Sequence, residues 1–398
     1  MVLETYKKIK EIHKNNQIAI FVPDYKYNLN FLKNISHSDD IEVISNHEPF
    51  FSNNKYLNFI VRQCFGIIDF IKAITSKKKG EGWTYHTKIF KEFNRSDTIL
   101  QIAGISFTEN FGTLSAFHWM YTMLVAKYLR KQYYCLPQSL GPSDSKLITL
   151  FAKIGLNTVT HIMPRGRVSE KFVNNLHLKH KNVTFIPDLA FSYENPNISD
   201  DAKIYMRYNL SNEKRYMAVI FNSHLYFWIG RPIIDLIAKE IDSLVLKHGY
   251  TVLLIAHEVN DGDQKDDRYV NRLIYEGCTK KESVIQINED LRANEVKSLI
   301  KICEFTICAR FHGMISSLKV GVIPVIIGWA DKYFEIMELF NLGHLVIDYH
   351  QITQNSLNGK INYVLDNNEE LKHQISKNIT QFENGSEYMK QIIVAYGK

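Results

Sequence analysis

The chain has 398 residues, which is too long for one ordinary hydrophobic core and suits two domains of about 200 residues each. Hydrophobic residues make up 45% of the sequence and charged residues 23%, so a disordered chain is excluded. The net charge of +6 permits phosphate-bearing ligands or an anionic membrane surface as partners. Because this charge is diffuse, we expect no nucleic acid partner.

The N-terminus and the cysteines bear on location. MVLETYKKIKEIHKN is a charged helical pattern without the apolar segment of a secretory signal. No uninterrupted apolar run approaches the roughly 20 residues that span a bilayer. The five cysteines are scattered, form no CxxC pair, and are odd in number, which argues against a disulfide framework. We therefore expect a cytoplasmic protein that does not cross a membrane.

Short, apolar, β-branched runs predict strands, and helical patterns lie between them. Runs of this kind are typical of strands buried on both faces, and the intervening helices imply parallel pairing. The first block comprises 17–23, 40–45, 98–104, 133–141, 161–166 and 183–191, and the second comprises 216–224, 250–258, 284–290, 304–313, 322–329 and 345–351. Two such blocks predict an α/β protein with two Rossmann-type, doubly wound lobes.

A polar stretch, SYENPNISDDAKIYMRYNLSNEKR (192–215), separates the two blocks, and we expect the domain boundary near 195–212. The predicted domains are therefore 1–200 and 201–365, followed by a helical tail over 366–398 that packs back onto the first lobe. One helix, 56–80, has two interpretations. It faces the core with a solvated run of lysines at its end, which we favour, or it lies on anionic lipid and gives peripheral membrane association.

Ligands of open parallel sheets bind beyond the C-terminal ends of the strands, and polar groups gather there in this sequence. In the first lobe Arg165 follows a predicted strand, and in the second lobe Arg310 and His312 end one and Lys332 follows the next. Singly, each has an ordinary structural explanation, but together they supply three cations and a histidine. Such a set suits a small anion that carries phosphate and carboxylate. The further positions that would line the cleft are Gly104, Gln138, Ser139, Ser169, Asn222 and His257.

From about 97 to 350 the sequence resembles the polysaccharide pyruvyl transferase family. The resemblance rests on stretches in the family's order, of which the Arg-x-His-Gly segment with its downstream Lys332 is the most specific. They are AGISF (103–107), LPQSLGP (136–142), PRGRVS (164–169), IPDLAF (186–191), VIFNSH (219–224), LLIAHEVNDGDQKDD (253–267) and ARFHGMISSLKVGVIPVI (309–326). The chain departs from the family at Ala103 and Gly166, and the family's N-terminal Gly/Asn-rich loop is absent from FVPDYKYNLNF.

The resemblance implies a GT-B-like fold with the active site in a cleft between the lobes. It implies phosphoenolpyruvate as donor, a glycan or lipid-linked oligosaccharide as acceptor, and a pyruvate ketal as product. By the same resemblance His312 is the catalytic residue, and Arg165, Arg310 and Lys332 bind the donor. An imidazolium is a suitable acid near neutral pH for protonating the methylene carbon of phosphoenolpyruvate. We expect no cofactor.

No His, Cys or carboxylate cluster has convincing metal-ligand spacing. The acidic run Asp261, Asp263, Asp266 and Asp267 lacks the glycine and the closing glutamate of an EF-hand loop, so we expect it to order a loop instead. Two alternatives remain: a GT-B glycosyltransferase that uses a nucleotide sugar, and a degenerate member of the family that binds glycan or a partner enzyme without catalysis. The sequence carries no signal for the oligomeric state or for the identity of the acceptor sugar.

Overall fold

A computed structural model describes residues 2–12, 18–22, 41–45, 67–68, 71, 87–259 and 266–396. The helix expected over 56–80 lies almost entirely outside the described residues, as do Asp261 and Asp263 of the acidic run. The chain divides into two compact units: unit 1 comprises residues 1–188 and 386–398, and unit 2 comprises 189–385.

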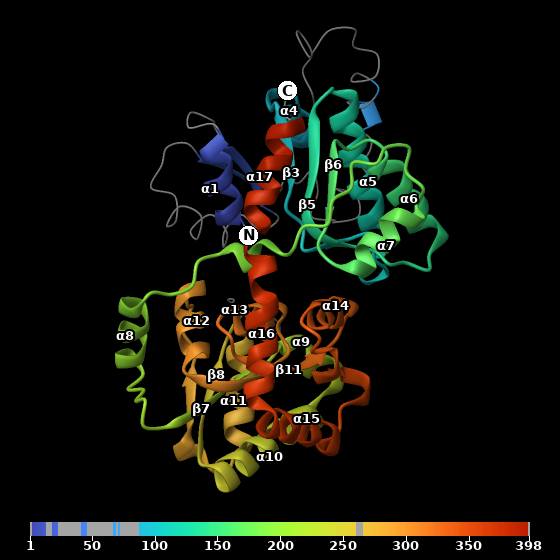
Figure 1. Cartoon of the computed structure of the whole chain (residues 1–398). Coiled ribbons are helices and arrows are strands. Elements are labelled where there is room, and N and C mark those ends of the chain that lie inside the picture. The colour runs from blue at the N-terminus through green and yellow to red at the C-terminus, as the bar shows by residue number, and fades with distance from the viewer. Residues whose placement is uncertain are drawn as a thin grey trace. The chain divides into compact units, whose positions relative to one another are not determined.

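Unit 1 is built on parallel strands (Figure 1). In its described part, β3 and β4 pair in succession along one side of β5, and β6 pairs along the other side. β1 and β2 form a separate parallel pair. The elements are α1 Val2–Ile12, β1 Ile18–Val22, β2 Ile41–Ser45, α4 Lys88–Arg95, β3 Thr98–Gln101, β4 Ile105–Ser106, η1 Glu109–Phe111, α5 Gly112–Tyr128, β5 Gln132–Leu140, α6 Lys146–Leu156, β6 His161–Pro164, α7 Arg167–Asn175 and α17 Gly385–Tyr396.

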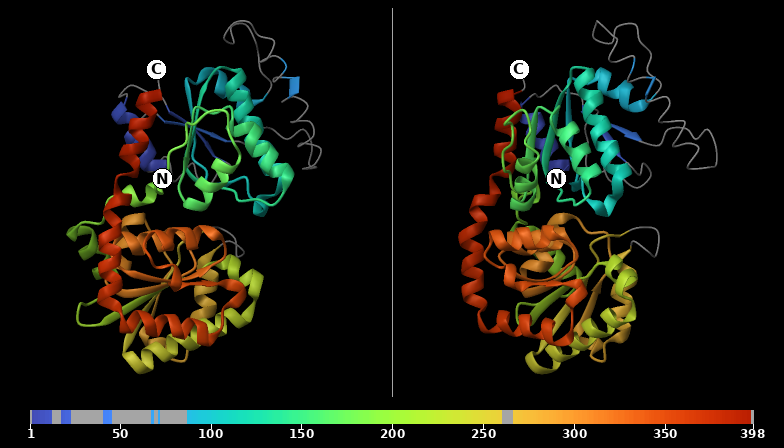
Figure 2. Two further views of the ribbon diagram at one scale, coloured as in Figure 1. Left: turned by 45° about the vertical axis from the view of Figure 1, so that its right-hand side comes forward. Right: turned by 90° about the vertical axis from the view of Figure 1, so that its right-hand side faces the viewer.

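Unit 2 has helices on both sides of a parallel sheet (Figure 2). Over its described residues the sheet has six strands in the order β12-β11-β10-β7-β8-β9. The first part runs η2 Leu189–Ser192, α8 Ile198–Arg207, β7 Arg215–Ile220, α9 Ser223–Ile229, α10 Arg231–His248, β8 Tyr250–Ile255, α11 Asp267–Gly277, η4 Lys281–Ser283 and β9 Val284–Ile287. The second part runs α12 Ala293–Lys301, β10 Cys303–Cys308, α13 Phe311–Lys319, β11 Ile323–Gly328, α14 Asp331–Leu339, η5 Gly343–Leu345, β12 Val346–Asp348, η6 Tyr349–Gln351, α15 Gln354–Asp366 and α16 Asn368–Glu383.

The chain passes from unit 1 to unit 2 after Asp188, earlier than the expected 195–212. The polar stretch expected there as a linker is folded, because α8 packs on α12. The Tyr205 hydroxyl donates to the Ser298 carbonyl oxygen at 3.1 Å, and Lys301 pairs with Asp201 at 2.6 Å. The expected tail is also divided, since α16 belongs to unit 2 and only the residues from 386 onward belong to unit 1.

One predicted strand, 183–191, is wrong. The segment runs beside β6, where the Thr184 amide donates to the Ile162 carbonyl oxygen and the Ile186 amide to that of Pro164, but it makes only an isolated bridge. Pro187 has no N–H with which to continue the ladder, and Leu189 then begins a 3-10 helix. Most other predicted strands are present but end earlier, as at β7 and β10, where the residues after Ile220 and Cys308 lead into α9 and α13.

Candidate active site

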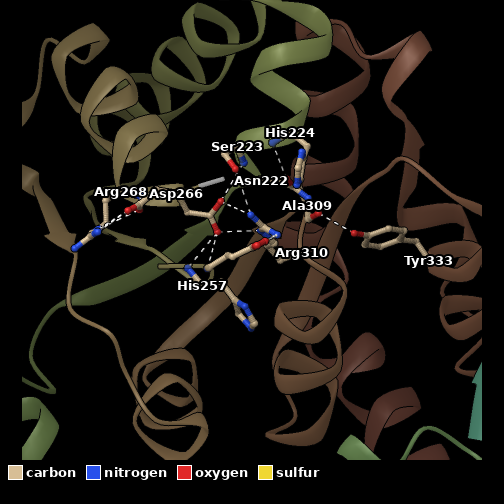
Figure 3. Close-up of polar contacts among 11 residues, drawn as sticks. Asn222, Ser223, His224, His257, Asp266, Arg268, Ala309, Arg310 and Tyr333 are labelled. Carbon is tan, nitrogen blue, oxygen red and sulfur yellow. Dashed lines mark hydrogen bonds and ion pairs between the residues drawn. The ribbon is translucent and has the colours of Figure 1, made fainter. Parts of the chain in front are cut away.

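The C-terminal edge of the sheet in unit 2 is organised around Asp267, a fully buried carboxylate at the start of α11. Its Oδ1 accepts a hydrogen bond from the Ser223 amide at 3.0 Å, and its Oδ2 from the amides of Glu258 at 2.9 Å and His257 at 3.3 Å. The Arg310 guanidinium donates to both oxygens, from Nε at 2.9 Å and from Nη2 at 2.5 Å (Figure 3). One carboxylate therefore ties together the loops after β7, β8 and β10.

Arg310 carries a charge that carboxylates already balance. It forms an ion pair with Glu258 in addition to the pair with Asp267. Burial by itself would lower the pKa of the Arg310 guanidinium, but the two carboxylates outweigh burial and raise that pKa. Because two carboxylates face one guanidinium, an anionic ligand here needs further positive groups. The role of Arg310 in donor binding stays a prediction.

His312 lies in the first turn of α13, with its side chain exposed. Its imidazole stacks on that of His257, with ring centroids 6.3 Å apart and planes at 13°, and meets the Phe311 ring edge to face at 5.6 Å. Burial lowers the pKa of His257, and the nearby Arg310 guanidinium lowers it further, so His257 is neutral near pH 7. The site therefore presents an exposed imidazole against a neutral one.

Close packing of α13 on the sheet fixes the position of His312. A Cβ on Gly313 would lie 2.8 Å from Cys308 Sγ and 3.0 Å from Ile220 Cγ2, so only glycine fits at this approach. The Tyr333 hydroxyl donates to the Ala309 carbonyl oxygen at 2.9 Å, which anchors the loop between β10 and α13 to α14 (Figure 3). The Arg-x-His-Gly segment is thus held from both sides.

Lys332 lies in the first turn of α14, among aromatic rings. Its Nζ is 4.4 Å from the centre of the Trp329 ring and 5.1 Å from that of Phe311. Phe311 therefore contacts both the His312 imidazole and the Lys332 ammonium. The rings therefore fix the position of the Lys332 ammonium through cation–π contacts.

An aromatic surface continues from Trp329. Trp228, at the end of α9, is 53% exposed and meets Trp329 edge to face, with ring centroids 5.7 Å apart. The Tyr349 ring centroid lies 5.7 Å from that of Trp228, and the His224 imidazole stacks on Trp228 with ring centroids 6.0 Å apart. We call Trp228, Trp329 and Tyr349 the aromatic rim.

Asn222 and His312 flank the topological switch point of the sheet in unit 2. β7 and β10 are neighbours, and the chain continues from β7 to β8 on one side and from β10 to β11 on the other. Such an arrangement opens a crevice at the C-terminal ends of the two strands, where open α/β sheets bind ligands. Asn222 follows β7 and caps α9, accepting from the His224 amide at 2.8 Å, while His312 follows β10.

Unit 1 places its candidates at the ends of β5 and β6. Arg165, 3% exposed, pairs with Asp188 at 2.5 Å and donates from Nε to the Ser139 hydroxyl at 3.1 Å. The Gln138 side-chain oxygen Oε1 accepts from the Ser106 hydroxyl, whereas its buried Nε2 has no hydrogen-bond partner among the described residues. The donor-binding role of Arg165 stays a prediction, and what the structure adds is that its charge is balanced by Asp188.

The remaining candidates of unit 1 have local roles. The Ser169 hydroxyl accepts from the Leu140 amide at 3.0 Å, which joins α7 to β5. Gly104 is exposed, and its carbonyl oxygen accepts from the Ser139 amide. A Cβ on Gly104 would meet nothing within 4 Å, so the space beside this backbone is open.

In unit 2 the structure brings His312 and His257 together directly, Arg310 through Asp267, and Lys332 through Phe311. Sequence reasoning missed the acidic partners Asp188 and Glu258, and it gave Asp267 only a loop-ordering role. Asp267 does order loops, but it also holds Arg310. The available signal for Asp188 was a charged residue enclosed in an apolar run, since a buried charge needs a partner.

Two absences concern the described residues only. No group of three or more His, Cys, Asp or Glu side chains within them could hold a metal ion. None of the helices seen there is long and apolar enough to cross a bilayer.

Comparison with known proteins identifies the family. Residues 28–331 match the polysaccharide pyruvyl transferase family, a range that contains His312 and ends one residue before Lys332. Among curated proteins, the amylovoran biosynthesis protein AmsJ of Erwinia amylovora is 21% identical over 305 residues, which cover 75% of this chain and 72% of AmsJ.

Solved structures resemble the whole chain in fold. UDP-GlcNAc 2-epimerase from Neisseria meningitidis, bound to UDP-GlcNAc, matches with a TM-score of 0.61 at 10% identity, covering 98% of this chain and 95% of the epimerase. Anabaena HepE, in complex with UDP and glucose, matches with a TM-score of 0.55 at 14% identity, covering 98% and 94%. At these identities the likeness shows the fold alone, two Rossmann-like units of the GT-B kind. The family match spans most of the chain, and the chain therefore belongs to the polysaccharide pyruvyl transferase family, transferases of polysaccharide biosynthesis.

Proposed function

We propose that the chain transfers a pyruvyl group from phosphoenolpyruvate to two hydroxyls of one sugar in an exopolysaccharide, capsule or cell-wall glycan, or in its lipid-linked precursor. The products are a pyruvate ketal and inorganic phosphate. The observation that carries this proposal is the placement of His312, exposed at the start of α13 on the switch point of the sheet, in a chain of this family.

In the proposed reaction the His312 imidazolium gives its proton to the methylene carbon of phosphoenolpyruvate, which becomes a methyl group. One sugar hydroxyl then adds to the adjacent carbon and loses its proton to the neutral imidazole. The carbon–oxygen bond to phosphate breaks, and its electron pair leaves with the phosphate. The second hydroxyl closes the ketal, and its proton leaves with the phosphate. Overall, phosphoenolpyruvate and a diol give a ketal and hydrogen phosphate.

The charges around His312 suit an anionic donor. His257, its stacking partner, is neutral because its pKa is lowered, so it does not repel an imidazolium. The N-terminal end of a helix carries a partial positive charge, and α13 begins at Phe311, next to His312. Together with the Lys332 ammonium this end suits the phosphate and carboxylate of the donor. We assign Arg310 a second task, which is to hold the loops after β7, β8 and β10 in place through Asp267.

The aromatic rim supports a sugar as acceptor. One face of a pyranose ring carries mainly C–H bonds, and such a face packs on the electron-rich face of an aromatic ring. Trp228 is exposed, and both the Trp228 ring and the Lys332 ammonium contact the Trp329 ring. A sugar on Trp228 would therefore lie beside the proposed donor site.

The test incubates the purified chain with phosphoenolpyruvate and a panel of oligosaccharides and follows phosphate release. His312→Ala should abolish release, while His373→Ala, which removes an exposed histidine of α16, should leave it unchanged. Lys332→Met should raise KM for phosphoenolpyruvate more than it lowers kcat. No release from phosphoenolpyruvate with any acceptor, alongside turnover of a nucleotide sugar, would overturn the proposal in favour of glycosyl transfer.

A further inference from the structure

Helices α5 and α6 of unit 1 present large apolar side chains to solvent. Five residues form what we call the α5–α6 face: Phe111 and Leu114 are each 57% exposed, Leu147 is 47% exposed, Leu150 49% and Ile154 39%. Single exposed apolar residues are ordinary, but a contiguous group of them marks an interaction surface. Figures 1 and 2 show α5 and α6 side by side in this unit.

The five side chains belong to one surface. The two helices approach closely at Gly155, where a Cβ would lie 3.1 Å from the Met120 Cα, and the rings of Phe117 and Phe151 meet at 5.7 Å. At the start of both helices, Glu109 Oε1 accepts from the amides of Asp144 and Ser145 at 2.8 Å. These two hydrogen bonds join the turn before α5 to the turn before α6. Phe111 and Leu147 therefore lie beside two turns that are held together.

The spacing on α6 gives a continuous stripe. Leu147, Leu150 and Ile154 are three and four positions apart, so they lie on one side of the helix. The opposite side is occupied by buried residues, among them Ile148 and Ala152, that face the core. The helix is therefore apolar on both sides, and the core accounts for only one of them.

The charge around this face is mainly positive, although Glu109 and Asp144 lie in the turns before the two helices. Neither α5 nor α6 contains an acidic residue, whereas Lys146 and Lys153 are exposed on α6. Over residues 109–170 the sequence has three acidic residues, Glu109, Asp144 and Glu170, against seven basic residues, of which Arg165 is buried against Asp188. An apolar stripe on a helix that carries lysines and no acidic residue has the composition of a helix that lies on anionic lipid.

We propose that the α5–α6 face binds the surface of an anionic phospholipid membrane. Its five apolar side chains enter the boundary between headgroups and acyl chains, and Lys146 and Lys153 contact headgroup phosphates. A second copy of the chain is a poorer occupant. Pairing this face with itself would bring the lysines of both copies together without an acidic partner on either helix. The proposal is independent of the chemistry at His312 and of the segment 56–80.

The test measures binding of the full chain to vesicles by co-sedimentation. The vesicles are phosphatidylcholine alone, or phosphatidylcholine mixed with an equal amount of phosphatidylglycerol, at about 0.1 M salt and again at high salt. The wild type should bind only the anionic vesicles, and high salt should weaken binding. Leu150→Glu should reduce the partition coefficient about tenfold or more, since it removes apolar contact and adds a repelled charge.

The matched control is Leu246→Glu, which places the same charge at a leucine of α10 in unit 2 that is 65% exposed. It should bind as the wild type does. If Leu150→Glu unfolds by circular dichroism, Lys146→Ser with Lys153→Ser replaces it and should also weaken binding. The proposal is overturned by a wild type that ignores anionic vesicles, or by equal losses in test and control variants. It is also overturned if Leu150→Glu only converts a dimer into a monomer, without changing vesicle binding.

Discussion

Replacing Asp267 by Asn should destabilise unit 2 strongly, although the two side chains have the same shape. Asp267 is fully buried and accepts five hydrogen bonds: from the amides of Ser223, His257 and Glu258, and from Nε and Nη2 of Arg310. Asn keeps one oxygen and replaces the other by an NH2 group. Oδ1 accepts from two donors and Oδ2 from three. Whichever oxygen the Asn NH2 group replaces, at least two N–H groups of the site then face this NH2 group instead of an acceptor.

The size of the effect follows from these counts. Each buried donor left without an acceptor costs about 1–3 kcal/mol, and breaking a buried ion pair by removing one partner costs about 3–5 kcal/mol. Arg310 keeps Glu258 as a partner, so we expect a loss of about 3–5 kcal/mol in all. For a unit of about 200 residues, at about 2–4 °C for each kcal/mol, the unfolding temperature of unit 2 should fall by about 6–20 °C.

Asp266→Asn is the matched control, one position away. Asp266 caps α11 by accepting from the Arg268 amide at 2.8 Å, and its ion pair is with an Arg268 side chain that is 40% exposed. Asn caps helices as well as Asp does, and because the Arg268 end of this pair reaches solvent, its loss should cost less than loss of the pair that the fully buried Asp267 forms. Differential scanning calorimetry of both variants checks the prediction. If the two melt within about 2–4 °C of each other, the view that Asp267 holds the site together is refuted.

The remaining predictions concern packing, pH and the acceptor. Gly313→Ala should lower the free energy of unfolding by about 1–3 kcal/mol, because the new Cβ would clash with Cys308 Sγ. Gly359→Ala in α15, where nothing lies within 4 Å of the new Cβ, should be neutral or stabilising. Urea unfolding of the two variants checks this difference. Burial and nearby His180 lower the pKa of His161 to about 4, below its unfolded value of about 6.5. The neutral folded form therefore contributes stability that is complete above about pH 6.5 and is lost as the pH falls toward 4, by up to about 3 kcal/mol. His161→Gln should flatten the stability curve in this range, and a loss as steep as in the wild type would contradict the assignment. Trp228→Ala should raise KM for the sugar acceptor with little change in KM for phosphoenolpyruvate or in melting temperature, and an unchanged acceptor KM would remove the aromatic rim from the acceptor site.

Local sequence patterns determined much of the fold. β7, β8, β10 and β11 are predominantly apolar runs, and a strand buried on both faces needs such a run whatever its neighbours are. The Arg-x-His-Gly segment is recognisable in the sequence, but the close approach at Gly313 involves Ile220 of β7 as well as nearby Cys308. The strand prediction over 183–191 failed where a single residue, Pro187, ends a ladder that its apolar neighbours would otherwise continue.

Only the tertiary structure decided how charges are paired and which apolar faces are covered. The partner of Arg310 lies 43 positions away and that of Arg165 lies 23 positions away, and no pattern of neighbours indicates such a pair. Leu147, Leu150 and Ile154 resemble core residues in the sequence as much as Ile148 and Ala152 do. Hydrophobicity does not distinguish the two sides of α6. The side that meets α5 and the sheet is settled by packing, and the other side is exposed in the described part of the chain.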